Sequence, residues 1–337
     1  MSSVITVGMI EAAEVLSAVS YTPDERAQML DNLEGQIASA RARRAFPLAN
    51  DMPAASRFDP RLPTTTLPQP GPLRFTAVDA SCPEDETDIA FAPLTHLSAW
   101  IARRDLTSRR LTEIYLRRIE TLNPDLLCFA TVVPERALAQ ADAVDRHLAA
   151  GTHLGPLHGI PYGLKDLFDT AGIETGWGAE PFRGRLPERD AAIVTKLEAA
   201  GAVLLGKTTL GALAYGDIWY GGRTRNPWNL NEGASGSSAG SASATAAGLC
   251  GFSIGTETLG SITSPSQRCG TTGLRPTFGR VSRAGGMALC WSLDKVGPIC
   301  RAAEDTAMVL GVLNGFDPAD RSSLDAPFAF DAADPIA

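Results

Sequence analysis

The chain has 337 residues, of which 44% are hydrophobic and 20% are charged, and its formal net charge is −8. This composition is typical of a soluble globular protein with a sizeable core. The acidic balance weighs against a nucleic-acid partner or an anionic membrane surface, and no apolar run is long enough to span a bilayer.

The cysteines show neither a CxxC pair nor the spacing of a metal site. They stand at Cys82, Cys128, Cys250, Cys269, Cys290 and Cys300. We therefore expect reduced thiols and a cytoplasmic protein. The first twenty residues include Glu11 and Glu14 but no Lys or Arg, so they do not look like a secretory signal peptide.

Residues 1 to about 45 are predicted to be helical. The run Thr22-Pro23-Asp24-Glu25 is a capping box with proline at the first helical position. Residues 46–90 then become rich in proline and lose periodicity, which predicts an extended linker. We therefore expect an N-terminal helical segment over 1–45, a linker over 46–90 and a main domain over 91–337.

The main domain alternates helices with short apolar strands. Helical periodicity is strongest over three segments, Leu94–Arg103, Ser108–Leu122 and Pro134–Ala149. Later segments predict a strand that enters a loop within 158–170, a helix at Asp190–Ala200 and a buried strand at Ala202–Gly206. This alternation predicts an α/β fold, in which helices cover both faces of a mixed, twisted sheet.

The stretch from Gly233 to Gly270 says most about chemistry. Two serine-bearing, glycine-rich turns, centred on Ser237 and Ser261, flank a segment built mostly of Ala, Ser, Gly and Thr. Small side chains allow close backbone approach, so such turns expose N–H groups and hydroxyls to a reacting group. The pattern indicates hydrolase chemistry. A flexible Gly/Ser linker is the alternative, and the apolar runs near the turns weigh against it.

A nucleophilic serine needs a base. Gly236–Gly240 matches a GxSxG elbow centred on Ser238, but that elbow requires a histidine later in the chain. All the histidines precede it, at His96, His147, His153 and His158. Lys165 is the best alternative base, because it lies in an apolar run where burial would lower its pKa far below about 10.4. A surface lysine, or one paired with Asp166, is the competing interpretation.

Several sequence blocks in a fixed order carry a resemblance. They are HGIPYGLKDLFDTAGIETGWG (158–178), AAIVTKLEAAGAVLLGKTTLGALAYG (191–216), TRNPWNL (224–230), SGSSAGSASATAAG, GTETLGSITSPS and CGTTGLRPTFGRVS. Over roughly residues 90–320 the chain resembles the amidase signature family. The resemblance implies the amidase signature fold, an enzyme that hydrolyses a small-molecule amide, and no metal or organic cofactor.

The resemblance also implies a site. Lys165 matches the family's catalytic lysine, Ser237 its bridging serine on a cis peptide bond, and Ser261 the nucleophile that forms the acyl-enzyme. Neutral Lys165 would accept the proton of Ser237 while Ser237 accepts that of Ser261. The implied oxyanion-hole donors are the backbone N–H groups of Thr258, Leu259, Gly260 and Ser261.

The chain departs from the family pattern around the nucleophile turn. Glu257 replaces the family's aspartate, Leu259 its first glycine, and Thr263 the arginine after Ser-Ile. We expect Arg268 to substitute for the ion pair that Thr263 cannot form.

Three interpretations of function follow. Amide hydrolysis through Ser261, Ser237 and Lys165 is favoured by the order of the motifs. The second is a non-catalytic or truncated relative that acts as a fragment or partner subunit. The third is an amidotransferase subunit that releases ammonia from glutamine, because the N-terminal helices resemble the small helical subunit of glutamyl-tRNA amidotransferase.

The length of the chain bears on the second interpretation. Family members are longer, and the tail after the last predicted helix is polar and aperiodic. We therefore expect a core that is incomplete at its C-terminus and less stable than that of a longer relative. The N-terminal helices suit a homo-oligomer.

Overall fold

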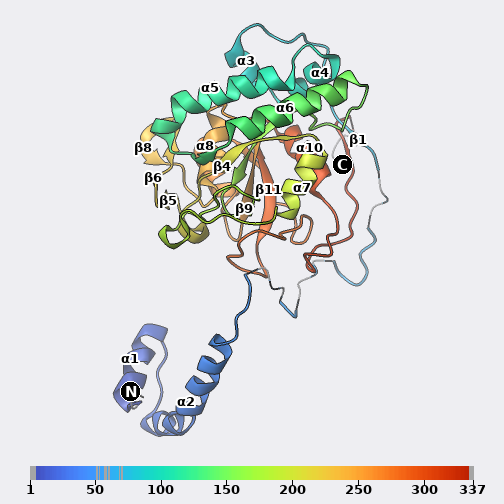
Figure 1. Ribbon diagram of the computed structural model, residues 1–337. Helices are drawn as coiled ribbons and strands as arrows, with labels where there is room; N and C mark the ends of the chain where they lie inside the picture. Colours follow the sequence, from blue (N-terminus) through green and yellow to red (C-terminus); the bar gives the residue numbers. More distant parts are fainter. Residues whose placement is uncertain are drawn as a thin grey trace. The chain divides into compact units, whose positions relative to one another are not determined.

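The computed structural model describes residues 5–50, 52, 54–56, 59, 61–67, 69 and 71–333. The chain divides into two compact units, Met1–Met52 and Pro53–Ala337, each with its own internal packing (Figure 1).

The first unit consists of two helices, α1 (Val7–Ser17) and α2 (Pro23–Arg44). The Thr22 hydroxyl accepts the backbone N–H of Glu25, and the Glu25 carboxylate accepts the backbone N–H of Thr22 at 2.7 Å, so the predicted capping box is confirmed. Arg26 on α2 donates to Glu14 on α1 with two nitrogens, each at 2.7 Å, and joins the helices. No residue of α2 is buried, so this helix depends on its caps and end charges more than on packing.

A six-stranded mixed sheet forms the centre of the second unit. Its strands stand in the order β10 (Thr272–Gly273), β11 (Lys295–Cys300), β9 (Phe252–Glu257), β3 (Pro161–Lys165), β4 (Val203–Thr208) and β2 (Phe129–Val132). The strand β3 runs parallel to both β4 and β9. The outer strands β2, β11 and β10 are each antiparallel to their inner neighbours.

Helices lie on both sides of this sheet, and Figure 1 shows α5 and α6 side by side above it. The helices are α3 (Glu86–Phe91), α4 (Leu94–Arg103), α5 (Ser108–Leu126), α6 (Pro134–Ala149), α7 (Ala192–Ala199), α8 (Ala239–Ala246), α9 (Thr263–Cys269) and α10 (Ala303–Leu313). The predicted α/β fold with a mixed sheet between helices is confirmed.

Small elements complete the unit. The paired strands are β1 (Leu73–Arg74) with β12 (Phe330–Asp331), β5 (Ile218–Trp219) with β6 (Gly222–Arg223), and β7 (Arg225–Asn226) with β8 (Asn229–Gly233); the short 3-10 turns are Glu180–Phe182 and Ala212–Ala214.

Most predicted elements agree with the structure to within a few residues. The helices α4 and α6 have the predicted bounds, whereas α5 continues through Pro124 to Leu126. Within the stretch expected to be a linker, the structure contains β1 and the start of α3.

The tail packs more closely than its polar composition predicts. Leu324 and Ala326 are buried, and the Arg280 guanidinium donates to the carbonyls of Ala326 and Pro327 at 3.0 and 2.7 Å. The strand β12 pairs in parallel with β1, far away in the sequence. Backbone hydrogen bonds and a partly buried arginine contact, rather than a periodic apolar face, hold this segment.

The small-residue segment between the two serine turns forms α8, and all eight of its residues are buried. A Cβ at Gly240 would overlap neighbouring backbone atoms, so the close approach of this helix requires glycine there. The hydroxyls of Ser241 and Ser243 donate to backbone carbonyls at 3.0 and 2.8 Å, which satisfies polar groups inside the core. A buried helix excludes the flexible-linker interpretation.

Candidate active site

Three parts of the chain meet at one end of the sheet: the end of β3, the turn before α8, and the end of β9 with the turn after it. Because β3 and β9 are parallel neighbours, their carboxyl ends lie at the same edge. Lys165 is the last residue of β3, and Thr256 is the next-to-last residue of β9. The sheet topology therefore places these two residues together.

The Lys165 side chain is fully buried and surrounded by oxygen atoms. Its Nζ lies 2.9 Å from the Oγ of Ser237 and 2.9 Å from the Oγ of Ser238. The Thr256 hydroxyl lies 2.8 Å from the same nitrogen, and the Thr256 carbonyl lies 3.3 Å from it. The predicted contact between Lys165 and Ser237 is thus present.

Burial lowers the pKa of Lys165 to about 7, although the nearby carboxylates of Asp294 and Glu257 oppose this shift. The surface-lysine interpretation is wrong, because no part of the side chain is exposed. The ion-pair interpretation is also wrong, because Asp166 lies beside another buried lysine: its Oδ1 is 3.4 Å from Lys207 Nζ.

Ser238 shares the lysine with Ser237. Its hydroxyl accepts the backbone N–H of Thr256 at 3.1 Å and donates to the Thr256 carbonyl at 3.1 Å. Because its single proton is used, Ser238 can only accept from Lys165. The two N–H groups of a neutral lysine can then donate to Ser238 and Thr256, and the lone pair is left for the proton of Ser237. The hydrogen-bond geometry suits a neutral Lys165.

The first serine turn has the backbone that the resemblance implies. The peptide bond between Gly236 and Ser237 is cis. A Cβ at Gly236 would overlap the carbonyl oxygen of Gly216, so glycine is required at this position. Ser237 is 1% exposed, and its hydroxyl is therefore shielded from bulk water.

The second serine turn stands against the first. The backbone N–H of Ser238 donates to the Ser261 carbonyl at 3.1 Å, and the hydroxyls of Ser235 and Ser264 lie 2.7 Å apart. Ser261 is partly exposed. Within the described residues its hydroxyl makes no hydrogen bond, including none to Ser237. The structure brings the two turns together and leaves the Ser261 hydroxyl unengaged.

The backbone of the second turn is open to a ligand. In residues 71–333, no hydrogen bond uses the backbone N–H of Leu259 or Ser261. Gly260 has φ of +108°, and no atom lies within 4 Å of the position that a Cβ would take. The Leu259 side chain is 80% exposed, so the replacement of glycine by leucine does not close the turn.

The Glu257 carboxylate accepts hydrogen bonds from the residues that directly follow this turn. Its Oε2 accepts the backbone N–H groups of Ile262 and Thr263, each at 2.9 Å, and the Thr263 hydroxyl at 3.1 Å. Burial opposes ionisation of Glu257, but hydrogen bonds from the amides of Thr263, Ile262 and Gly260 outweigh it and keep its pKa below the usual range.

The prediction that Arg268 supplies the missing ion pair is wrong. Arg268 is exposed on α9 and pairs with Glu232 at 3.1 Å. Arg275 lies nearest to the buried carboxylate instead, with Nη1 3.5 Å from Glu257 Oε1. The backbone N–H of the preceding Leu274 donates to the Pro298 carbonyl on β11, and this contact brings Arg275 beside the sheet.

Sequence reasoning missed three polar residues of this site. Ser238 was considered only as a nucleophile, whereas the structure makes it a partner of Lys165. Thr256 lies within the GTETLGSITSPS block but was given no role there, and Asp294 belongs to none of the quoted blocks. Only the strand register relates these two residues. Thr256 on β9 is paired with Val296 on β11, and Val296 stands two positions after Asp294.

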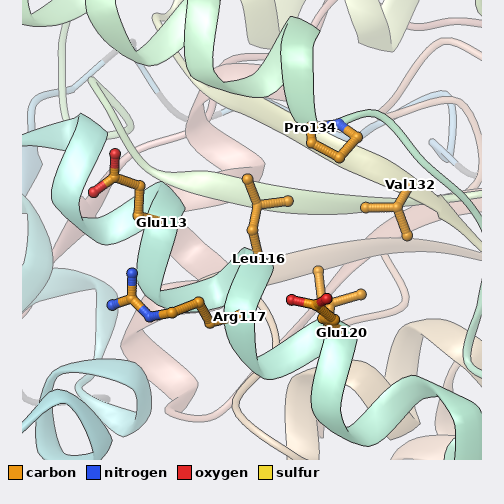
Figure 2. A pocket seen from close by; sticks show the side chains of 7 residues that line it. Glu113, Leu116, Arg117, Glu120, Val132 and Pro134 are labelled. Carbon is orange, nitrogen blue, oxygen red and sulfur yellow. The ribbon is translucent and has the colours of Figure 1, made fainter.

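A separate hollow of about 470 Å³ lies between α5, β2 and the start of α6 (Figure 2). It is lined by Glu113, Leu116, Arg117, Ile119, Glu120, Val132 and Pro134. None of the predicted site residues lines this hollow, so it does not belong to the site around Lys165.

Curated relatives match the chain over most of its length. A glutamyl-tRNA(Gln) amidotransferase subunit from Methylococcus capsulatus is 46% identical over 237 residues, which are 69% of this chain and 49% of that protein. A putative amidase, AmiD, from Mycobacterium tuberculosis is 45% identical over 263 residues, which are 77% of this chain and 55% of that protein. The chain therefore spans about half the length of these curated relatives.

A solved structure and a family model agree with these relatives. The native peptide amidase from Stenotrophomonas maltophilia superimposes with a TM-score of 0.65 and 38% sequence identity, over 69% of this chain and 50% of that one. The model of the Amidase family matches residues 110–336. This chain belongs to the amidase family, also called the amidase signature family.

Proposed function

We propose that this chain is an amidase that cleaves the C–N bond of a small carboxylic amide through an acyl-enzyme on Ser261. One observation carries the proposal: the Nζ of the fully buried Lys165, whose pKa is about 7, lies 2.9 Å from the Ser237 hydroxyl. A lysine that is neutral near pH 7 is a competent general base. Membership of the amidase family supports this class of reaction.

In this mechanism Ser261 Oγ bonds to the carbonyl carbon while its proton passes to Ser237 and the Ser237 proton passes to Lys165. The carbonyl oxygen becomes an oxyanion, and the backbone N–H groups of the second turn hold it. The sequence predicts donors at Thr258, Leu259, Gly260 and Ser261. Of these, the N–H groups of Leu259 and Ser261 make no other hydrogen bond in residues 71–333, whereas the Gly260 amide donates to Glu257.

The relay then runs in reverse. Ser237 protonates the departing nitrogen and recovers a proton from Lys165, and the C–N bond breaks. A water molecule gives its proton to the same relay, attacks the acyl-enzyme and releases the carboxylic acid. Every proton is returned, so no cofactor takes part.

Ammonia release from glutamine, as part of an amidotransferase, is a second candidate. The 46% identity with a glutamyl-tRNA(Gln) amidotransferase subunit favours it. Because both reactions use the same relay, they differ in substrate rather than in mechanism. Hydrolysis of glutamine that a partner protein and tRNA stimulate would support this candidate, and hydrolysis of simple amides by the chain alone would support the first.

We further propose a cytoplasmic homo-oligomer. The cysteines are all free thiols, which suits a reducing compartment. Among the described residues, no helix is both long enough and apolar enough to cross a lipid bilayer. On α1, Val15 and Leu16 are 81% and 90% exposed, so this helix offers an apolar surface to a second copy.

A fluorophosphonate probe tests the proposed nucleophile. Intact-mass analysis should show one adduct on the wild-type chain and none on Ser261→Ala. The matched control is Ser292→Ala, which removes an exposed serine outside the relay and should keep the adduct. A folded wild-type chain that gains no adduct would contradict the proposal and favour a non-catalytic role.

A further inference from the structure

Two buried carboxylates enclose the turn that carries Ser261. Glu257 is the last residue of β9 and is 2% exposed, and Asp294 directly precedes β11 and is 8% exposed. The two strands are antiparallel neighbours, with Glu257 paired to Lys295. The turn at 258–261 therefore leaves the sheet between the two carboxylates.

Glu257 holds the far side of the turn. Its Oε2 accepts three hydrogen bonds at 2.9–3.1 Å, two from the amides of Ile262 and Thr263 and one from the Thr263 hydroxyl. Ile262 directly follows Ser261, so these contacts fix the backbone on the C-terminal side of the serine. The N-terminal side of the turn needs another anchor.

Asp294 supplies that anchor. Its Oδ1 accepts the hydroxyl proton of Thr258, the first residue of the turn. Its Oδ2 accepts the backbone N–H groups of Leu289 and Cys290 at 2.8 and 3.0 Å, which ties the aspartate to a second loop. Lys295 Nζ donates to the Thr258 carbonyl at 2.8 Å and reinforces the same end.

The charges of these carboxylates also reach the buried lysine. Burial lowers the pKa of Lys165, and Asp294 and then Glu257 are the groups that oppose it. The other charges around the turn are the cations Lys295 and Arg275. On the side of β4, Lys207 and Asp166 form a pair of opposite charge. Asp294 and Glu257 are therefore the negative groups that act on Lys165 in this site.

We propose that Glu257 and Asp294 are positioning residues, which clamp the two ends of the 258–261 turn and keep Ser261 and its backbone N–H groups in place opposite Lys165. This inference depends on the proposed function of Ser261. Neither carboxylate touches the reacting atoms. A misplacement of about 1 Å in such a site lowers a rate by about 10²-fold, so the clamp affects activity although it takes no part in proton transfer.

The chain has few lysines, so the electrostatic part of the inference, the effect of the Glu257 and Asp294 charges on the pKa of Lys165, can be measured without any substrate. The lysines are Lys165, Lys196, Lys207 and Lys295, four in all. Lysine labelled with ¹³C at Cε therefore gives four NMR signals, which single lysine-to-arginine or lysine-to-methionine variants assign. The pH titration of the Lys165 signal reports its pKa directly.

The test compares Glu257→Gln, Asp294→Asn and the control Glu232→Gln, whose carboxylate pairs with Arg268 at the surface. Loss of either buried negative charge disfavours protonated Lys165, so its titration midpoint should move below the wild-type value near 7. Glu232→Gln should leave the midpoint unchanged. The same Lys165 midpoint in all four proteins would overturn the electrostatic part of the inference, namely that the charges of Glu257 and Asp294 act on Lys165.

A test of whether the two carboxylates hold the 258–261 turn in place needs variants that keep both of them. Thr258→Val removes the hydroxyl bonded to Asp294, and Thr263→Val removes one bonded to Glu257. Both should label with fluorophosphonate about tenfold more slowly and exchange the amide hydrogens of 258–263 faster, while the Lys165 midpoint stays at the wild-type value. Wild-type labelling and exchange rates in both variants would overturn the clamp.

These measurements separate the two proposals. If the wild-type chain gains no adduct, the proposed function fails, while the NMR midpoints and the amide exchange rates still decide whether the carboxylates act on Lys165 and on the turn. If the wild-type chain is labelled and the variants behave like it, only the clamp fails.

Discussion

Lys165 Nζ and Ser237 Oγ lie 2.9 Å apart, although 72 positions separate the two residues in the chain. The lysine ends a buried strand, and the serine follows Gly236, where any larger residue would overlap a neighbouring carbonyl. Neither side chain is free to move to solvent. This pair depends on the sheet topology and on a glycine, and its geometry is set before any substrate arrives.

Replacing Lys165 by methionine should abolish most reactivity while preserving the fold. The loss of a positioned general base lowers rates by about 10²–10⁴-fold. Methionine fills similar space without a charge that must be buried, so the urea midpoint should be equal or higher. Fluorophosphonate labelling rates and urea unfolding measure the two effects. A variant that labels at the wild-type rate would show that another group is the base.

The sequence predicted the framework better than the contacts of the site. The bounds of α4 and α6 follow from periodic apolar positions, and the resemblance placed Lys165 and Ser237 correctly with respect to each other. Both kinds of signal are local, since each depends on a short run of residues with a recognisable pattern.

The contacts that the sequence did not predict join segments that are far apart in the chain and share no recognisable pattern. Arg275 rather than Arg268 approaches Glu257, because a hydrogen bond from Leu274 to β11 carries residue 275 toward the sheet. The tail packs through contacts to Arg280 and through pairing of β12 with β1. Such partners are set by strand register and tertiary packing, which a pattern in one segment does not contain.

The buried lysine should make folding stability depend on pH in a defined window. In the unfolded chain Lys165 stays protonated up to about pH 10.4, whereas in the folded chain its pKa is about 7. Between these values the unfolded state binds more protons, so the free energy of unfolding rises with pH. Lys207, whose pKa burial lowers to about 8, adds to the same trend.

Urea unfolding at about pH 7.5 and about pH 9.5 measures this slope. The change in free energy between the two pH values should be smaller in Lys165→Met than in the wild type, because one of the two shifted groups is removed. Equal slopes would mean that Lys165 is not shifted in the folded protein.

Removal of the Ser238 hydroxyl should slow fluorophosphonate labelling, and the adduct should still form on Ser261. Ser238→Ala takes away one acceptor of Lys165 and two contacts to Thr256, so the lysine is less well held. We expect labelling to slow by about 10–100-fold, less than in Ser237→Ala. Peptide mapping of the wild-type adduct is the check, since an adduct on Ser238 would restore the elbow interpretation.

The close packing of α8 should make Gly240 one of the least replaceable residues near the site. A Cβ there would overlap the Cys128 carbonyl and the backbone nitrogen of Thr209, which are main-chain atoms that cannot rotate away. Gly240→Ala should therefore lower the free energy of unfolding by about 3 kcal/mol or more. Ala242→Gly, on the same buried helix, loses a methyl group and some helix propensity and should cost only about 1.5 kcal/mol. Urea unfolding followed by tryptophan fluorescence compares the two, and a Gly240→Ala midpoint equal to that of the wild type would show that α8 can move away from its neighbours.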